Sequence, residues 1–252
     1  MIPALAGVAL APLLLWQGRR VRRQALRLPE AAGPREGCAG QGVQCLRVLI
    51  VGDSSAAGVG ARTQDEALAE QLSRALSQRL GFQVRWQLLG QTGHSTADAL
   101  AQLAQAQRVL AADVMVTALG VNDVSAGLSA ARWMQQLDRL HALAVQRAGV
   151  RYTLHSAVPP MHAFPLLPQP LRWWLGGRAA SLNRALFRQL AASPVRGVQA
   201  LPQELQADDS AAGLMAADGF HPSPAGYALW AEVLAARLAR EWRSIERGQG
   251  SA

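Results

Sequence analysis

From residue 46 onward the sequence predicts an α/β fold, in which helices cover both faces of a parallel sheet of about five strands. The first observation behind this prediction is that short apolar runs alternate with longer amphipathic runs along the chain. The second is composition, since 50% of the 252 residues are apolar and 17% are charged. That proportion supplies a sizeable core and excludes a disordered or fibrous protein.

Each element follows from the spacing of its apolar residues. The run LRVLIV over 46–51 is typical of a buried strand, and it stops at Gly52. Leucines at every fourth position from Leu68 to Leu80 mark the apolar face of a helix within 64–80. By the same criteria we expect strands over 82–89, 113–119, 150–158 and 197–201, and helices over 95–110, 129–148, 178–192 and 223–244.

The first 45 residues differ in character from the rest. Residues 1–18 are apolar and uncharged, and four arginines follow within residues 19–23, whereas a secretory signal carries its positive charge before the apolar run. A helix over 1–18 spans about 27 Å, against about 30 Å for a hydrocarbon core, and Pro3 and Pro12 weaken it. Two interpretations stay open: a short membrane anchor that leaves the main domain on the cytoplasmic side, or an apolar arm of a cytoplasmic protein that packs on the domain or lies in the membrane interface.

The remaining boundaries follow from composition. Residues 19–45 are basic at first and then rich in Gly and Pro, which predicts a linker. Residues 46–245 form the main domain, and residues 246–252 are expected to be a tail. Because residues 1–27 contain no candidate catalytic group, we expect a chain without them to be soluble and active.

Charge and composition exclude several classes of function. The net charge of +8 rests on 25 arginines and no lysine, and half of it lies in residues 1–36. The diffuse excess that is left does not indicate a nucleic-acid partner. The absence of lysine excludes a phosphate-binding loop of the Walker type, and two cysteines exclude a disulfide scaffold. No pair of histidines shows the spacing of a metal site, so the sequence predicts no bound metal.

Unusual polar groups stand where predicted strands end or where the last helix begins. They are the four blocks GDSS over 52–55, TGHS over 92–95, GVND over 120–123 and DGFH over 218–221. The carboxyl ends of parallel strands meet at one edge of a sheet, where crevices form. We therefore expect these four blocks to share one site.

The residue types in these blocks suit acyl transfer. A serine needs an adjacent base that is oriented by a third group, and Ser54, His221 and Asp218 could fill these roles. Acyl transfer also needs donors aimed at the developing oxyanion, which the Ser54 N–H, the Gly93 N–H and the Asn122 amide could supply. Taken singly, each block also fits an ordinary turn or a helix cap.

In this order the four blocks resemble the SGNH, or GDSL-type, hydrolase family, over about residues 46–240. The resemblance implies a three-layer α/β/α sandwich with a flavodoxin-like sheet. It also implies hydrolysis of carboxylic esters or thioesters through an acyl-enzyme, without a cofactor. It assigns Ser54 as nucleophile, Asp218 and His221 as its partners, and Ser54, Gly93 and Asn122 as the oxyanion hole. Gly90 competes with Gly93 for its role, and a sugar O-acetyl esterase or a non-catalytic binding module of the same fold are the alternatives.

Substrate contacts are expected from two places. His94 stands where many relatives carry Asp, which points to a role in specificity. The segment 158–177 is rich in Pro and apolar side chains, and it could close over the site as an acyl-binding wall, dock on a membrane or protein, or cover one sheet edge. As a wall it would offer Phe164, Trp173 and Trp174 to an apolar acyl ester.

Overall fold

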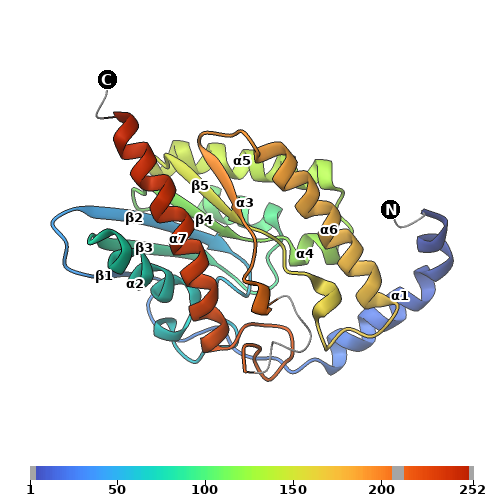
Figure 1. Ribbon diagram of the computed structural model, residues 1–252. Helices are drawn as coiled ribbons and strands as arrows, with labels where there is room; N and C mark the ends of the chain where they lie inside the picture. Colours follow the sequence, from blue (N-terminus) through green and yellow to red (C-terminus); the bar gives the residue numbers. More distant parts are fainter. Residues whose placement is uncertain (1–3, 206–212, 250–252) are drawn as a thin grey trace.

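A six-stranded sheet forms the middle layer of the computed structural model, which describes residues 4–205 and 213–249 (Figure 1). The strand order is β1-β3-β2-β4-β5-β6, and every neighbouring pair is parallel except β1 with β3. The strands are β1 (Glu36–Ala39), β2 (Cys45–Gly52), β3 (Gln83–Gly90), β4 (Val114–Ala118), β5 (Tyr152–Ser156) and β6 (Arg196–Gln199). The predicted α/β class and its parallel sheet are confirmed.

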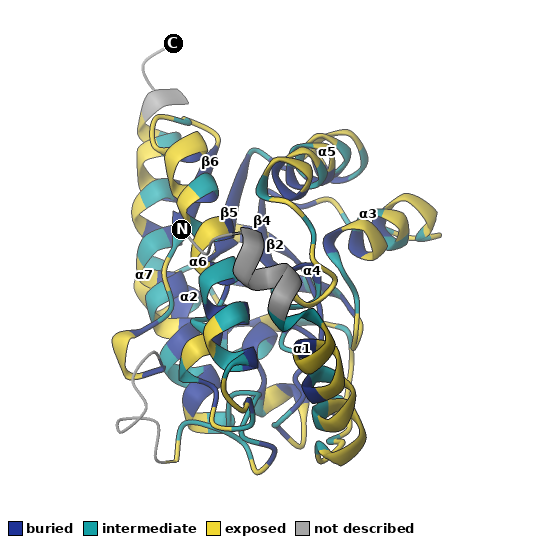
Figure 2. Cartoon of the chain, turned by 90° about the vertical axis from the view of Figure 1, so that its right-hand side faces the viewer, coloured by how far each residue is buried: buried dark blue, intermediate teal, exposed yellow. Residues whose placement is uncertain are grey.

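Two layers of helices cover the sheet, because its central strands are apolar on both sides. In β2, Val48 and Ile50 face α2 (Leu68–Leu80) and α7 (Pro224–Gln249), while Leu49 and Val51 face α3 (Thr96–Gln105) and α5 (Ala130–Ala148). A third apolar cluster joins α6 (Leu171–Leu190) to α5 and to α1 (Ala4–Gln24). The sheet is largely buried, and the helices turn their exposed residues outward (Figure 2).

Two elements differ from the sequence prediction. Strand β1 lies within the expected linker 19–45, where four residues pair antiparallel with the free edge of β3. Helix α6 begins at Leu171, inside the apolar segment and well before residue 178. Gly176 and Gly177 lower the helix propensity there, but a Cβ at Gly176 would lie 2.6 Å from that of His162, so the glycine allows the short 3₁₀ turn Met161–Ala163 to pack on α6.

The ends of the chain also extend beyond the expected boundaries. Helix α7 continues to Gln249, so 246–249 of the expected tail is helical, and 250–252 lie outside the described residues. At the other end, α1 includes the basic run and packs against α6. Leu14 is buried there, and the buried side chain of Gln17 donates a hydrogen bond to the Gln169 carbonyl (2.7 Å) and accepts one from the Leu171 amide (3.1 Å). In the described part of the chain, no helix has both the length and the apolar character needed to cross a membrane.

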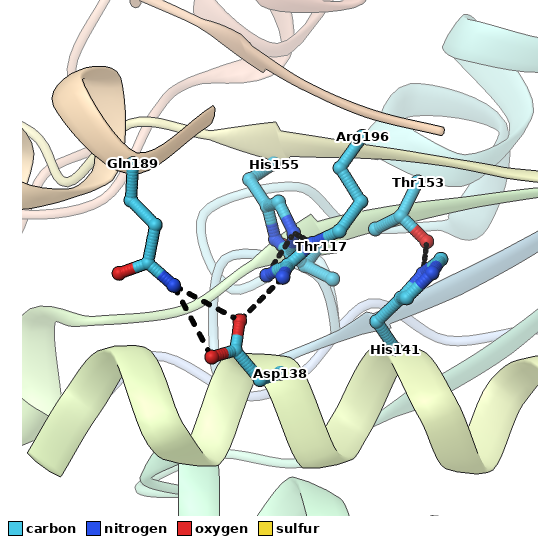
Figure 3. A network of polar contacts seen from close by, with 7 residues as sticks. All are labelled: Thr117, Asp138, His141, Thr153, His155, Gln189 and Arg196. Atoms are coloured by element: carbon cyan, nitrogen blue, oxygen red, sulfur yellow. Dashed lines mark hydrogen bonds and ion pairs between the residues drawn. The ribbon is translucent and has the colours of Figure 1, made fainter. Parts of the chain in front are cut away.

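A buried polar network holds the β6 edge of the sheet to α5 (Figure 3). Arg196 donates two hydrogen bonds to Nε2 of His155, each 3.2 Å long, and forms an ion pair with Asp138 of α5. The other ring nitrogen of His155 therefore carries the proton and donates to the Thr117 hydroxyl (2.8 Å). Burial, reinforced by the Arg196 charge, holds the pKa of His155 well below its ordinary value. His155 is thus a neutral structural residue of the sheet.

Candidate active site

The nucleophile candidate lies in a tight turn directly after β2. Gly52 ends the strand, and a Cβ there would lie 2.4 Å from that of Ala56 and 2.6 Å from the Ala118 carbonyl oxygen, so only glycine fits. The Asp53 carboxylate accepts a hydrogen bond from the Ser55 amide (2.9 Å), which fixes the turn around Ser54. Burial raises the pKa of Asp53 to about 6, although the Ser55 amide and His221 act in the opposite direction.

The DGFH block folds into the turn that the spacing of Asp218 and His221 requires. Gly219 adopts φ +62°, and one oxygen of Asp218 accepts hydrogen bonds from the Phe220 and His221 amides, both 3.0 Å long. The other oxygen lies 2.6 Å from Nδ1 of His221, and Nε2 of His221 lies 2.8 Å from the Ser54 hydroxyl. The structure therefore brings the three predicted catalytic residues into one continuous chain of hydrogen bonds.

Hydrogen bonds keep the Asp218 carboxylate of this chain ionised. Burial by itself would raise the pKa of Asp218. Hydrogen bonds from the His221 ring and from the two backbone amides outweigh burial and hold this pKa below its ordinary value. An ionised Asp218 accepts the Nδ1 proton of His221 and leaves Nε2 free to accept a proton from Ser54.

Asn122 is held beside this chain by a second turn. Gly120 adopts φ +126°, and a Cβ there would lie 2.4 Å from Cγ2 of Val158. Helix α4 (Val121–Ser125) follows, and the Asn122 side-chain amide donates to the His94 carbonyl (2.9 Å). This bond uses one of the two amide hydrogens and leaves the second available for an oxyanion.

The two candidate glycines occupy different surroundings. Gly90 is buried at the end of β3, and a Cβ there would come within 3.2 Å of Ala56. Gly93 is exposed, adopts φ +86°, and would meet no atom within 4 Å of an added Cβ. Gly93 is therefore the glycine that a substrate could approach.

Sequence reasoning missed the residues that support Asn122. Asp123 is buried and accepts hydrogen bonds from the Thr96 amide and from the Thr96 hydroxyl (2.8 Å), which in turn accepts from the Trp133 indole (3.0 Å). These bonds join the GVND turn to the start of α3. The available signal was that Thr96 and Asp123 follow the ends of β3 and β4, the two strands that flank β2, but an Asn-Asp pair such as 122–123 is also common in ordinary turns.

A groove of about 720 Å³ opens beside the catalytic residues. Asn122, Asp218 and His221 are among the residues that line it. Its other walls come from α1, α4 and the segment 161–175, and most of their side chains are apolar. A smaller cavity of about 40 Å³ lies next to Asp53 and Ser55.

The predicted substrate contacts fall in different places. Trp174 lines the groove, and Phe164 lines the smaller cavity, with its ring 4.7 Å from that of Phe220. Trp173 lines neither, because adjacent residues of a helix point about 100° apart and its side chain is 45% exposed; its position does not support the predicted contact. His94 is half-buried, and its Nδ1 has no hydrogen-bond partner among the described residues. The groove-lining residues of α1 were not predicted at all.

Comparison with known proteins gives the family. A model of the GDSL-like lipase/acylhydrolase family matches residues 50–229. The chain belongs to this family. The matched range contains all four blocks, so the resemblance that they predicted is confirmed, whereas α1 and β1 lie outside it. Within residues 4–205 and 213–249, no group of three or more His, Cys, Asp or Glu side chains could hold a metal ion.

Individual relatives agree with this assignment. A GDSL-like esterase of Mycobacterium tuberculosis is 28% identical over 198 residues, which is 75% of this chain but only 60% of that relative. The crystal structure of the lipase Lip_vut3 from a goat rumen metagenome is 18% identical, with a TM-score of 0.57 over 77% of this chain and 97% of that one. A lipase/acylhydrolase from Enterococcus faecalis is 20% identical, with a TM-score of 0.56 over 77% and 95% of the two chains. These structural likenesses confirm the three-layer α/β/α fold.

Proposed function

We propose that this member of the GDSL-like family hydrolyses carboxylic esters through an acyl-enzyme formed on Ser54. The observation that carries the proposal is the continuous Asp218–His221–Ser54 chain, with contacts of 2.6 and 2.8 Å. Nε2 of His221 accepts the Ser54 proton as the hydroxyl oxygen attacks the ester carbonyl. Asp218 keeps the imidazole in the required tautomer and stabilises the imidazolium that forms.

The oxyanion donors act in both halves of the reaction. The Ser54 and Gly93 amides and the Asn122 side chain stabilise the negative charge on the carbonyl oxygen. When the intermediate collapses, the ester C–O bond breaks and the leaving alcohol takes the proton from His221. Water then gives a proton to His221 and attacks the acyl-enzyme; the bond between the acyl carbon and the Ser54 oxygen breaks, the carboxylic acid is released, and His221 returns the proton to Ser54.

The walls of the groove favour an apolar acyl ester, or thioester, over a sugar acetyl ester. Beyond Asn122 and His221, the lining consists mostly of apolar side chains, and Arg19, Arg22 and Arg178 are its basic members. A sugar ring would bring hydroxyl groups against the apolar side chains, and such groups lose free energy when they are buried without hydrogen-bond partners.

The test uses p-nitrophenyl butyrate and a matched pair of serine variants. Ser54→Ala is expected to abolish turnover, while Ser55→Ala, one residue away in the same turn, keeps it. A fluorophosphonate probe is expected to label the wild type and Ser55→Ala but not Ser54→Ala. Labelling at Ser55, or butyrate hydrolysis by Ser54→Ala at the wild-type rate, would contradict the proposal.

We also propose that the enzyme meets its substrate at the cytoplasmic face of a membrane. Support comes from the outward side of α1, where Leu13 and Trp16 are 41% and 55% exposed and Arg20 stacks on Trp16 at 5.4 Å. Exposed apolar and basic side chains on one helix suit an anionic lipid surface. Full-length wild type is expected to co-sediment with anionic vesicles, and full-length Trp16→Ser to a smaller extent. The proposal would be contradicted if both proteins were recovered equally, and as well with zwitterionic vesicles as with anionic ones.

A further inference from the structure

Helix α1 lies outside the part of the chain that the family model matches, yet it lines the catalytic groove. Its groove-facing positions include Leu14, Gly18, Val21 and Ala25, which are spaced by four, three and four residues. This is the spacing of one helical face. Leu13 and Trp16 of the same helix are exposed and do not line the groove. This stripe of α1 therefore faces the site, flanked by Leu15, Arg19 and Arg22, which also line the groove, whereas Leu13 and Trp16 face away.

The other walls of the groove include reacting groups, since Asn122, Asp218 and His221 line it. Asn122 is the second residue of α4, and Val124 of the same helix and Gly127 just after it also line the groove. The apolar segment 158–177 supplies Leu167 and Trp174 to the lining. Since His221 lines the groove and its Nε2 lies 2.8 Å from the Ser54 hydroxyl, a chain attached to a carbonyl carbon at Ser54 can enter the groove between these walls. The volume of about 720 Å³ falls within the range of small-molecule sites.

The position of α1 is fixed by specific contacts. Leu14 is 8% exposed within the α6 cluster, and Gln17 is 7% exposed while it bonds both sides of the turn that opens α6. A buried amide that makes two such bonds sets the register of one helix on the other, since a shift along the axis would leave it unpaired. Helix α1 therefore forms a defined wall of the groove.

We propose that α1 completes a binding site for a linear acyl chain, and that its groove-facing stripe sets the chain length that the enzyme prefers. This inference rests on the proposed ester hydrolysis and adds the substrate class to it. The acyl part is the assigned occupant because it stays bound through both half-reactions, whereas the alcohol leaves after the first. Each methylene that the groove removes from water is expected to raise kcat/KM about fourfold.

Gly18 offers a direct test, because a Cβ added there meets no atom within 4 Å. A tryptophan at this position enters open space of the groove, and tryptophan has a higher helix propensity than glycine. Leu13→Trp is the matched control, since it adds the same side chain to the same helix on the face away from the groove. Urea unfolding midpoints establish that both variants are folded.

The measured quantity is the ratio of kcat/KM for p-nitrophenyl octanoate to that for p-nitrophenyl acetate, below the micellar concentration. The wild type is expected to favour octanoate. Gly18→Trp is expected to lower the ratio about tenfold or more, as if two or more methylenes had lost their contacts. Leu13→Trp is expected to keep it within about twofold.

Three outcomes separate this inference from the proposed function. If the wild type hydrolyses the acetate but the ratio is the same in Gly18→Trp, the acyl-chain site is overturned and ester hydrolysis stands. The same holds if Gly18→Trp instead changes the preference for octyl acetate over ethyl acetate, because the groove would then hold the alcohol. If purified, folded wild type hydrolyses no ester, the proposed function fails and the inference with it.

Discussion

Replacing Asp218 by Asn isolates the role of the carboxylate from its role in the turn. The Asn carbonyl oxygen can still accept the Phe220 and His221 amides, which now bond one Asp218 oxygen at 3.0 Å. The amide nitrogen then takes the place of the oxygen 2.6 Å from Nδ1 of His221. An N–H donor at that point favours the tautomer in which Nε2 carries the proton, so His221 donates to Ser54 and cannot accept from it.

The size of the effect follows from the loss of the catalytic tautomer. Since only the catalytic tautomer is lost, kcat is expected to fall about 10⁴-fold, or about 5.4 kcal/mol in transition-state free energy. The thermal unfolding midpoint should stay close to that of the wild type, because both backbone bonds survive. Asp218→Ala removes these bonds as well and is expected to lower the midpoint. A kcat for Asp218→Asn within tenfold of the wild type would refute the assigned tautomer.

Three further predictions concern other parts of the molecule. Asn122→Ala is expected to lower kcat about 100- to 1000-fold with little change in KM, because an oxyanion donor acts mainly in the transition state; a change confined to KM in steady-state assays would make Asn122 a substrate-binding residue. Gln17→Leu removes both bonds that hold α1 and is expected to lower the octanoate-to-acetate ratio, while Arg20→Leu on the outer face keeps it. Because the pKa of His155 is depressed in the native state, only the unfolded chain takes up this proton as pH falls below about 6.5. Relative to His155→Gln, the wild type is therefore expected to lose up to about 1.4 kcal/mol of unfolding free energy per pH unit below that point. Urea titrations at several pH values measure this difference, and parallel curves would contradict it.

The sequence was most informative where a residue type permits few environments. Val48 to Val51 are apolar on both faces, which requires helices on both sides of the strand, and both layers are present. Strand β1 could not be predicted, because the four residues EGCA show no clear alternation and depend on the open edge of β3 for their pairing.

Some residues of the candidate site could likewise be predicted from the sequence, and others could not. The hydrogen-bonded grouping of Ser54, Asp218 and His221 was predictable, because the residue types and order needed for a nucleophile, a base and an orienting acid are recognisable in a sequence. The position of α1 beside the groove could not be predicted, because hydropathy identifies an apolar run but does not indicate which part of the protein packs against it. The sequence predicts activity without residues 1–27, which stays a prediction, and it gives no sign that Leu14 and Gly18 line the catalytic groove.

The candidate active site combines residues that are far apart in the sequence of the domain. Ser54 follows the second strand, whereas His221 stands three residues before the last helix. That helix is fastened to the nucleophile turn by the Tyr227 hydroxyl, which donates to the Val59 carbonyl at 2.7 Å. On the proposed mechanism, a chain that ends before residue 218 holds Ser54 without the His221 base and is expected to be inactive, however well the rest of the sheet has formed.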